Sequence, residues 1–297
     1  MKLWGVDLGG TKIECAVIER EKAIIRRRMP TEADQGYKHI ISQIKKLITD
    51  VSAEIGLRPT TVGFATPGVL DPATRTMKNC NTVVMNGQPM RKDIENALQI
   101  PVKLANDANC FALAESIMGA GKNYPNADLV FGVIMGTGVG GGLVAHNRII
   151  EGIHGIAGEW GHNILEDNGE ICYCGKRGCV ETVISGVALE NYYERVSGNR
   201  LKLPEIVLNH LNGTDKYADK TIERLLEFYG RAISTLINVL DPNLIVIGGG
   251  VGNVDLLYTE GYKRIGKYMF NPGELKTPIL KPALGDSAGV FGAALLQ

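Results

Sequence analysis

The chain has 297 residues, of which 44% are apolar and 22% charged, and its 32 basic and 32 acidic residues give a formal net charge of +0. These values are typical of a soluble globular protein long enough for two domains, and the neutral balance argues against a basic surface for nucleic acid or an anionic membrane. Without a run of 18 apolar residues or a leader segment, and with six cysteines, the sequence predicts a cytoplasmic protein with no membrane or nucleic-acid partner.

The chain opens with a glycine-rich segment, LWGVDLGGTKIECAVIE, at residues 3–19. An apolar stretch reaches Asp7, turns through Gly9 and Gly10 and resumes as a second apolar stretch, which predicts a β-hairpin. Residues 128–150 repeat this plan around a Gly-Thr-Gly turn. We interpret the pair as an internal duplication with one copy in each domain.

Helices and strands alternate over the rest of the chain. Residues 36–56 place apolar side chains on one face at helical spacing, with Gly56 as the C-terminal cap. The further predicted elements are a strand at 62–71 that ends in a Pro-Gly turn, a short helix at 92–98, a strand at 102–105, a helix from about 107, helices at 187–196 and 219–240, a strand at 241–250 and a helix near 285. The mixture predicts an α/β protein with layers of sheet and helix.

Glycine-rich turns after strands expose backbone N–H groups, which can surround phosphate oxygens. None of the clusters matches a P-loop or a dinucleotide-binding fingerprint, and each taken alone is explained as well by a tight hairpin. A third cluster at 243–253, however, makes three in one chain, which favours a nucleoside triphosphate held between two related lobes. Asp7 is then the natural partner for Mg²⁺, through water, while Lys12 lies either near phosphate or exposed at a hairpin.

The most specific chemistry lies in residues 157–186. His162 is followed by Cys172, Cys174 and Cys179 in the spacing H-x9-C-x-C-x4-C. Three thiolates and one imidazole match the four-coordinate site that structural zinc prefers. The alternatives are a disulfide pair or free buried thiols.

Two carboxylates flank this cluster, Glu159 before it and Glu181 after it. Zinc with four protein ligands needs neither of them. We therefore interpret the cluster as a rigid support that positions spare carboxylates for a polar ligand.

Asp107 is the catalytic candidate. Asn106 and Asp107 stand where a strand gives way to a helix, and the simplest alternative role is an N-cap for the helix that starts at Ala108. Both roles can coexist if one side chain caps and its neighbour reacts. Phosphoryl transfer needs only a carboxylate that orients the acceptor hydroxyl and finally takes its proton.

Together these motifs resemble the ROK family of sugar kinases and repressors over essentially the whole chain. The motifs that carry the resemblance are DLGGTK (7–12), TPG (66–68), NDANCFALAE (106–115), GTGVGGG (136–142), GEWGH (158–162), CYCGKRGC (172–179) and VIGGG (246–250). The segments NGQP (86–89), AGEWGHN (157–163), CYCGK (172–176) and GNVD (252–255) look most like the fructokinase/mannokinase branch, and NDANCFAL also looks like N-acetylglucosamine kinases.

The resemblance implies an actin-like, hexokinase-type fold with two lobes and a ligand cleft between them. Residues 1–117, joined by a C-terminal helix at about 285–297, would form the first lobe, and residues 118–284, with the zinc site, the second. A homo-oligomer, a dimer in the first instance, is expected because family members frequently assemble.

The resemblance also implies roles for residues. Asp107 would be the base toward the primary hydroxyl of a sugar, and His162 would face zinc with one ring nitrogen and the sugar with the other. The remaining sugar contacts would be Gly68, Asn81, Asn106, Glu159 and Glu181. The nucleotide contacts would be Asp7, Gly9, Gly10, Thr11, Lys12, Gly136, Thr137, Gly138, Gly248 and Gly249.

Two classes of function fit the family. The first is an ATP-dependent kinase that phosphorylates a hexose at its 6-hydroxyl, with Mg²⁺ and a structural Zn²⁺; fructose is the first expectation, and N-acetylglucosamine or glucose the alternative. The second is a sugar-responsive regulator, which normally carries a DNA-binding region before the sugar domain, whereas DLGGTK begins here at residue 7. The segment after Asn81 lacks the aromatic residue that many relatives carry, which leaves the identity of the hexose open.

Overall fold

The computed structural model describes residues 1–271 and 275–297. The chain forms two compact units: unit 1 contains residues 1–122, 142–157 and 283–297, and unit 2 contains residues 123–141 and 158–282. The division expected from sequence placed residues 142–157 with the second lobe. They group with unit 1 because Gly142 lies against the first turn of the helix at Asp107, where an added Cβ would be 2.5 Å from the carbonyl oxygen of Ala108.

Unit 1 is built on a mixed sheet of order β3-β2-β1-β4-β7. Its strands are β1 (Lys2–Leu8), β2 (Lys12–Glu19), β3 (Lys22–Pro30), β4 (Val62–Thr66) and β7 (Val102–Asn106). The predicted hairpin at 3–19 is confirmed as the antiparallel pair β1–β2, and β3 continues it in antiparallel fashion. β1, β4 and β7 run parallel, so their carboxyl ends lie at one edge of the sheet.

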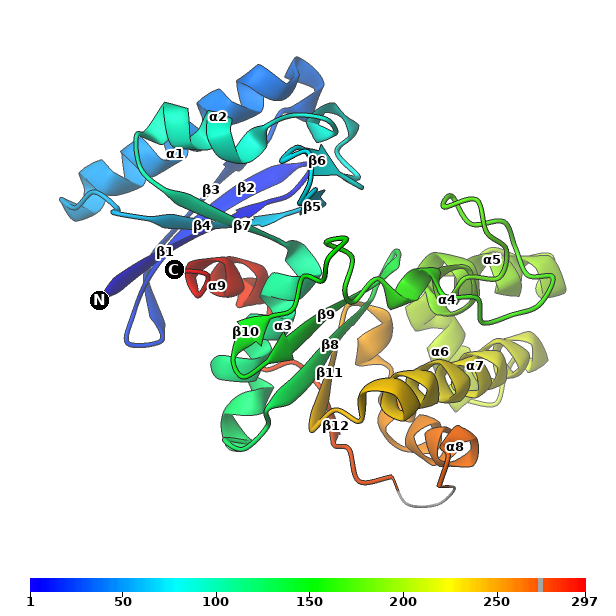
Figure 1. The fold of residues 1–297 in the computed structure, drawn as a ribbon. Helices are drawn as coiled ribbons and strands as arrows, with labels where there is room; N and C mark the ends of the chain where they lie inside the picture. Colours follow the sequence, from blue (N-terminus) through cyan, green and yellow to red (C-terminus); the bar gives the residue numbers. More distant parts are fainter. Residues whose placement is uncertain (272–274) are drawn as a thin grey trace. The chain divides into compact units, whose positions relative to one another are not determined.

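Helices cover both faces of this sheet (Figure 1). α1 (Tyr37–Ile55) and α2 (Met90–Leu98) lie on one face, and α3 (Asp107–Ile117) and α9 (Ala288–Ala294) lie on the other. α1 buries one apolar stripe, and the predicted cap Gly56 has the left-handed φ of 64° that glycine adopts at little cost.

The C-terminal helix α9 lies unusually close to the sheet of unit 1. A Cβ added to Gly63 of β4 would be 1.8 Å from the carbonyl oxygen of Ala293, and one added to Gly292 would be 1.8 Å from that of Cys110 in α3. Glycine at these two positions therefore lets α9 pack directly against β4 and α3, beneath the carboxyl edge of the parallel strands.

The second sheet has the order β10-β9-β8-β11-β12. Its strands are β8 (Leu129–Met135), β9 (Val139–Ala145), β10 (Arg148–Ile149), β11 (Leu244–Gly248) and β12 (Ile279–Leu280). Taken in chain order, they repeat the order of the first sheet: the first strand lies in the middle, the second and third lie on one side of it, and the fourth and fifth lie on the other. β9 and β10 are antiparallel, and β8, β11 and β12 are parallel. This is the topology that the predicted duplication expects.

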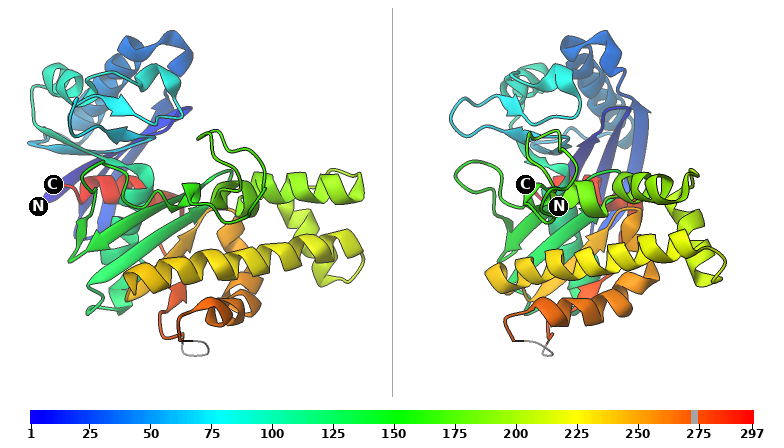
Figure 2. Two further views of the ribbon diagram at one scale, coloured as in Figure 1. Left: turned by 45° about the vertical axis from the view of Figure 1, so that its right-hand side comes forward. Right: turned by 90° about the vertical axis from the view of Figure 1, so that its right-hand side faces the viewer.

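The remaining helices belong to unit 2. They are α4 (Val180–Ile184), α5 (Gly186–Ser197), α6 (Leu203–Leu211), α7 (Lys216–Leu240) and α8 (Glu260–Tyr268). α5, α6 and α8 all pack on the long amphipathic helix α7 (Figure 2). Within the described residues, none of the helices combines the length and the apolar character needed to cross a membrane.

Candidate functional site

The carboxyl edge of the parallel strands in unit 1 brings together the predicted residues Asp7, Gly68, Asn106 and Asp107. Asp7 is in register with Ala65, one residue before the end of β4, and Thr66 is in register with Asn106. The Thr66 hydroxyl donates to the carbonyl oxygen of Gly68 at 2.9 Å and so holds the Pro-Gly turn at this edge. Open α/β sheets bind their ligands at such an edge.

Asn106 is the N-cap of α3, a role that the sequence left open between Asn106 and Asp107. Its Oδ1 accepts a hydrogen bond from the Ala108 N–H at 2.9 Å, with backbone angles typical of an N-cap. Oδ1 of Asp107 also accepts from this N–H, at 2.7 Å. The carboxyl group of Asp107 is therefore held at the first turn of α3, and its side chain remains open to solvent.

The carboxyl groups of Asp7 and Asp107 both have raised pKa values. Burial, followed by the negative charges of Asp107 and Glu14, raises the pKa of Asp7 from 3.8 to about 6, against the opposing effect of Lys12 and Arg28. Asp107 reaches solvent at its tip, but the surrounding protein removes much of its hydration, and this raises its pKa as well. Two such carboxyls that repel each other form a natural place for a cation.

Glu14 is a site neighbour that the sequence analysis missed. It lies directly opposite Asp7 in the β1–β2 register and is 3% exposed. Its two oxygens accept hydrogen bonds at 2.6 Å from Arg26 and Arg28 of β3, and Arg26 also donates to Ser287. The sequence did contain the information needed to find Glu14. The hairpin pairs it with Asp7, and the RRR run of the next strand places Arg26 and Arg28 on the same face, because alternate side chains of a strand share a face.

The turn between β1 and β2 carries the next predicted nucleotide contacts. The Gly9 N–H donates to the Lys12 carbonyl oxygen at 3.0 Å, and the Thr31 hydroxyl donates to the Gly9 carbonyl oxygen at 2.7 Å. Gly10, Thr11 and Lys12 are exposed. The turn is thus fixed at its base and open to solvent at its tip, as a phosphate-binding turn requires.

Gly68 and Asn81 belong to one wall of unit 1. A Cβ added to Gly68 would lie 2.5 Å from both the Lys78 carbonyl oxygen and the Cys80 sulfur, so the Pro-Gly turn packs directly on the segment that leads to Asn81. The Asn86 side chain fixes this segment, because it accepts from the Cys80 N–H at 2.9 Å and donates to the Cys80 carbonyl at 3.1 Å. Asn81 itself is exposed.

The second and third glycine clusters meet in unit 2. β8 and β11 are parallel, with Gly248 opposite Ile134, so the turn at 136–138 and the residues after Gly248 start from the same edge. Gly249 has a φ of 85°, and an added Cβ would lie 2.3 Å from the Met135 carbonyl oxygen, so only glycine fits. Five predicted nucleotide contacts thus share one backbone surface of unit 2: Gly136, Thr137, Gly138, Gly248 and Gly249.

The predicted sugar ligand Glu181 also belongs to this surface. Its Oε2 accepts from the Val139 N–H at 2.9 Å, and a Cβ added to Gly138 would lie 2.4 Å from the same oxygen. The carboxylate therefore lies directly beside the Gly-Thr-Gly turn. Glu159 is half-buried, and the negative charges of Glu159 and Glu181 both contribute to the raised pKa of Tyr173, after the larger effect of burial.

The four predicted metal ligands come together. One donor atom from each of His162, Cys172, Cys174 and Cys179 lies within 4.8 Å of the others. The Cys174 and Cys179 sulfurs are 3.6 Å apart, and Nδ1 of His162 is 3.5 Å from the Cys172 sulfur. Tetrahedral zinc with bonds of about 2.3 Å to sulfur separates two thiolates by about 3.8 Å, so the residues fit zinc. The sulfurs are too far apart for a disulfide, and the three cysteines are free.

Glycines make this loop possible. Gly178 has a φ of 67°, and an added Cβ would lie 1.8 Å from the Glu166 carbonyl oxygen; Gly175 has a φ of 88°. The second ring nitrogen of His162, expected to face the sugar, lies 2.9 Å from the Tyr173 hydroxyl. Tyr173 was absent from the predicted site, although its place between two of the ligand cysteines pointed to it.

The profile of the ROK family matches residues 3–297. The chain belongs to the ROK family. It is 36% identical to an N-acetyl-D-glucosamine kinase of Vibrio atlanticus, covering 99% of both proteins, and 35% identical to one of Aliivibrio fischeri, covering 99% of this chain and 98% of that protein. Among solved structures, the ROK hexokinase of Thermus thermophilus has 30% identity and a TM-score of 0.88, covering 99% of this chain and 97% of that one. A ROK glucokinase of Streptomyces griseus, solved with glucose and AMPPNP, has 26% identity and a TM-score of 0.79, covering 100% and 99%.

Membership of the ROK family confirms the expected fold class, α/β with the actin-like ATPase plan of two related units. The expected placement in the fructokinase/mannokinase branch was too narrow, because the curated ROK relatives above are N-acetylglucosamine kinases. Short motifs such as NGQP carry too few residues to separate branches that share a fold and a reaction.

Proposed function

We propose that this protein transfers the terminal phosphate of ATP to the 6-hydroxyl of N-acetylglucosamine. The chain is an ATP-dependent sugar kinase of the ROK family. The choice of sugar is supported by 36% identity, over 99% of both chains, to a kinase named for N-acetylglucosamine. Fructose, the first expectation from sequence, gives way to its stated alternative.

In the proposed mechanism, Asp107 accepts the proton of the sugar's primary hydroxyl. Its raised pKa favours proton acceptance, and the transition state of phosphoryl transfer is loose enough that this proton leaves late. Asn106 caps α3 and so keeps the neighbouring carboxyl in one orientation. The other hydroxyls and the acetamido group would be held by the predicted sugar contacts Gly68, Asn81, Asn106, Glu159, His162 and Glu181.

Backbone N–H groups would hold the phosphates. Unit 2 offers the joined turns at 136–138 and 248–249, and unit 1 offers the turn at 9–12 with the positive charge of Lys12. Asp7 fits Mg²⁺ because it is a carboxylate oxygen ligand whose repulsion with Asp107 a cation would relieve. Mg²⁺, when bound, neutralises charge on the transferring phosphate.

The thiolate cluster has a supporting role in this proposal. Zn²⁺ held by His162, Cys172, Cys174 and Cys179 would have four protein ligands and no open position, which is the arrangement of structural rather than catalytic zinc. It would fix the loop that carries His162 beside Glu159 and Glu181.

A coupled ADP-release assay with ATP and Mg²⁺ tests the proposed substrate. Among N-acetylglucosamine, N-acetylmannosamine, glucose, mannose and fructose, we expect kcat/KM to be about tenfold or more higher for N-acetylglucosamine, the size of a preference that one well-contacted substituent provides. A higher kcat/KM for fructose or glucose would contradict the choice of sugar. A parent protein that phosphorylates none of them would contradict the kinase.

The pH profile should show the raised pKa values of the two carboxyls. Asp7 must be ionised to hold Mg²⁺ and Asp107 must be ionised to accept a proton, so kcat/KM should fall as the pH drops through about 6. Ordinary carboxyls titrate nearer about 4. Because the two groups interact, the apparent pKa read from the acidic side of the profile describes the pair and not either carboxyl alone. Initial rates measured between pH values of about 4.5 and 8 check this; full activity down to the lower end would show that neither carboxyl is raised.

A further inference from the structure

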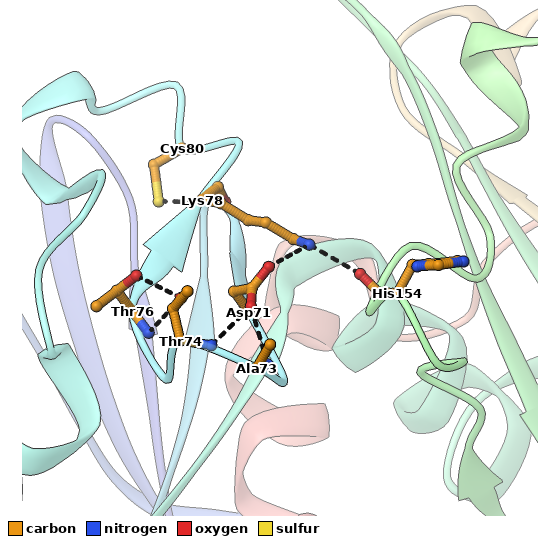
Figure 3. Close-up of polar contacts among 7 residues, drawn as sticks. All are labelled: Asp71, Ala73, Thr74, Thr76, Lys78, Cys80 and His154. Carbon is orange, nitrogen blue, oxygen red and sulfur yellow. Dashed lines mark hydrogen bonds and ion pairs between the residues drawn. The ribbon is translucent and has the colours of Figure 1, made fainter.

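Lys78 ties together two segments of unit 1 that are far apart in the chain. Its ammonium group lies 2.8 Å from Oδ2 of Asp71 and donates to the carbonyl oxygen of His154 at 2.9 Å. Figure 3 shows the lysine extended from the hairpin that carries Asp71 toward the backbone at His154, with the His154 ring turned away from it. One side chain thus bridges the hairpin and the loop at 150–157.

The hairpin end of this bridge leads into the candidate sugar residues of unit 1. Lys78 is the last residue of β6 (Met77–Lys78), which pairs with β5 (Val69–Leu70). Its carbonyl oxygen packs against Gly68, and the chain continues from it through Cys80 to Asn81. A change in the position of Lys78 would therefore act directly on both predicted sugar contacts.

The loop end of the bridge leads toward Glu159 and His162. The loop at 150–157 precedes them, and the Ala157 N–H closes it by donating to the Glu151 carbonyl at 3.1 Å. Its apolar side chains do not anchor it, since Ile153 is 86% exposed and Ile156 is 44% exposed.

Contact with the hairpin adds to the backbone hydrogen bonds that hold the loop. A Cβ added to Gly155 would lie in van der Waals contact with the Pro72 ring and the Leu70 carbonyl. The hydrogen bond from Lys78 to the backbone beside Gly155 is the polar part of this contact.

Asp71 in turn fixes the lysine. Its Oδ1 accepts from the N–H groups of Ala73 and Thr74, both at 2.9 Å, so the carboxylate is part of the turn that closes the hairpin. Hydrogen bonding to Lys78 and to this turn holds the pKa of Asp71 well below its ordinary range. The ammonium is therefore held by an ionised, oriented partner.

We propose that Lys78 is a positioning residue for sugar binding: through Asp71 it is aimed at the His154 carbonyl, and it holds the loop that leads to Glu159 and His162 in register with the wall formed by Gly68 and Asn81. The inference rests on the proposed function of those residues as sugar contacts. Lys78 touches neither the sugar nor ATP in this role, so its loss should change sugar affinity and leave the chemical step intact.

The test compares Lys78→Met with the parent enzyme. Methionine keeps most of the length of the side chain and removes the charge and the donor. We expect KM for N-acetylglucosamine to rise about tenfold while kcat and KM for ATP stay within about twofold, the pattern of lost binding rather than lost chemistry. Amide hydrogen exchange should become faster in residues 150–157 and stay unchanged in α1. Lys263→Met is the matched control, because it removes an exposed ion pair with Glu260 in unit 2.

Two further variants separate positioning from general stability. Asp71→Asn keeps the acceptor of the turn but removes the ion pair, and it should raise the sugar KM in the same direction; combined with Lys78→Met it should add little, because the two residues act as one unit. Lys78→Arg, which restores the charge and a donor, should recover part of the affinity.

An active parent enzyme whose Lys78→Met variant keeps its sugar KM and its exchange rates would overturn this inference alone. A lower kcat together with higher KM values for both N-acetylglucosamine and ATP, with no recovery by Lys78→Arg, would also overturn it, since this pattern indicates a merely structural role. A parent that uses none of the five sugars would overturn the proposed function and this inference with it.

Discussion

Replacing Asp107 with asparagine should lower kcat by about three orders of magnitude, the middle of the range of about 10²–10⁴ for removal of a general base. The amide keeps an oxygen at the first turn of α3 but cannot take the hydroxyl proton. Sugar should still bind, because an amide oxygen accepts hydrogen bonds from hydroxyl groups nearly as well as a carboxylate. The ADP-release assay gives kcat, and titration calorimetry with N-acetylglucosamine gives the dissociation constant. Near-normal turnover would remove Asp107 from the chemistry.

The same substitution should make the protein more stable at pH 8. The pKa of Asp7 is raised to about 6 in the folded protein, against 3.8 ordinarily, so the favourable contribution of this group is complete below pH 3.8 and is lost as the pH rises through about 6. Removing the charge of Asp107 relieves part of the repulsion that causes this loss. Asp50→Asn, the same change on the exposed face of α1, should alter neither kcat nor melting temperature.

The sequence predicted the parts of the structure that local pattern determines. The hairpin at 3–19, the helix capped by Gly56 and the strand-to-helix bend at Asn106 each depend on residues close together in the chain. The cluster of His162 with three cysteines is also nearly local, since close spacing in the chain favours the approach of the four side chains. The repeated glycine turn also predicted a non-local feature, because a duplicated segment implies that the two sheets have the same strand order.

Contacts between distant segments were beyond this kind of prediction. That Glu181 would bond the Val139 N–H, or that Lys78 would reach the His154 carbonyl, depends on the docking of loops. The return of residues 142–157 to unit 1 depends on the close approach of Gly142 to α3. Glu14 could have been found from the hairpin register alone, but a glutamate in a strand is more often an exposed residue than a buried one.

The loop at 163–178 has little regular secondary structure and few buried side chains. Its regular pairing is limited to two isolated bridges, Ile164 with Cys179 and Ile171 with Arg177, and both isoleucines are more than 60% exposed, at 62% and 65%. A two-pronged ion pair, Glu166 with Arg224 of α7 at 2.7 Å, attaches one end. Backbone hydrogen bonds such as those from the N–H groups of Leu165 and Glu166 to the Gly178 carbonyl order part of the loop, and the binding free energy of a metal ion would add to them.

Cys174→Ser should therefore lose zinc and sugar affinity together. We expect about one zinc per chain in the parent, isolated without chelator, and little in the variant, because a serine hydroxyl is a poor replacement for a thiolate. KM for N-acetylglucosamine should rise about tenfold or more, since His162 and its neighbours Glu159 and Glu181 lose their fixed positions. Metal analysis by mass spectrometry and the ADP-release assay measure both effects.

Most residues of this loop are half-buried or exposed, so the damage should stay local. Circular dichroism of Cys174→Ser should match the parent, while proteolysis within 163–178 should become faster. Cys15→Ala removes a buried thiol from β2, far from the cluster in the chain, and should keep its zinc. If the parent holds no zinc, the ion has no part in ordering the loop. If Cys174→Ser loses its zinc but keeps its sugar KM, the loop is ordered by its protein contacts alone.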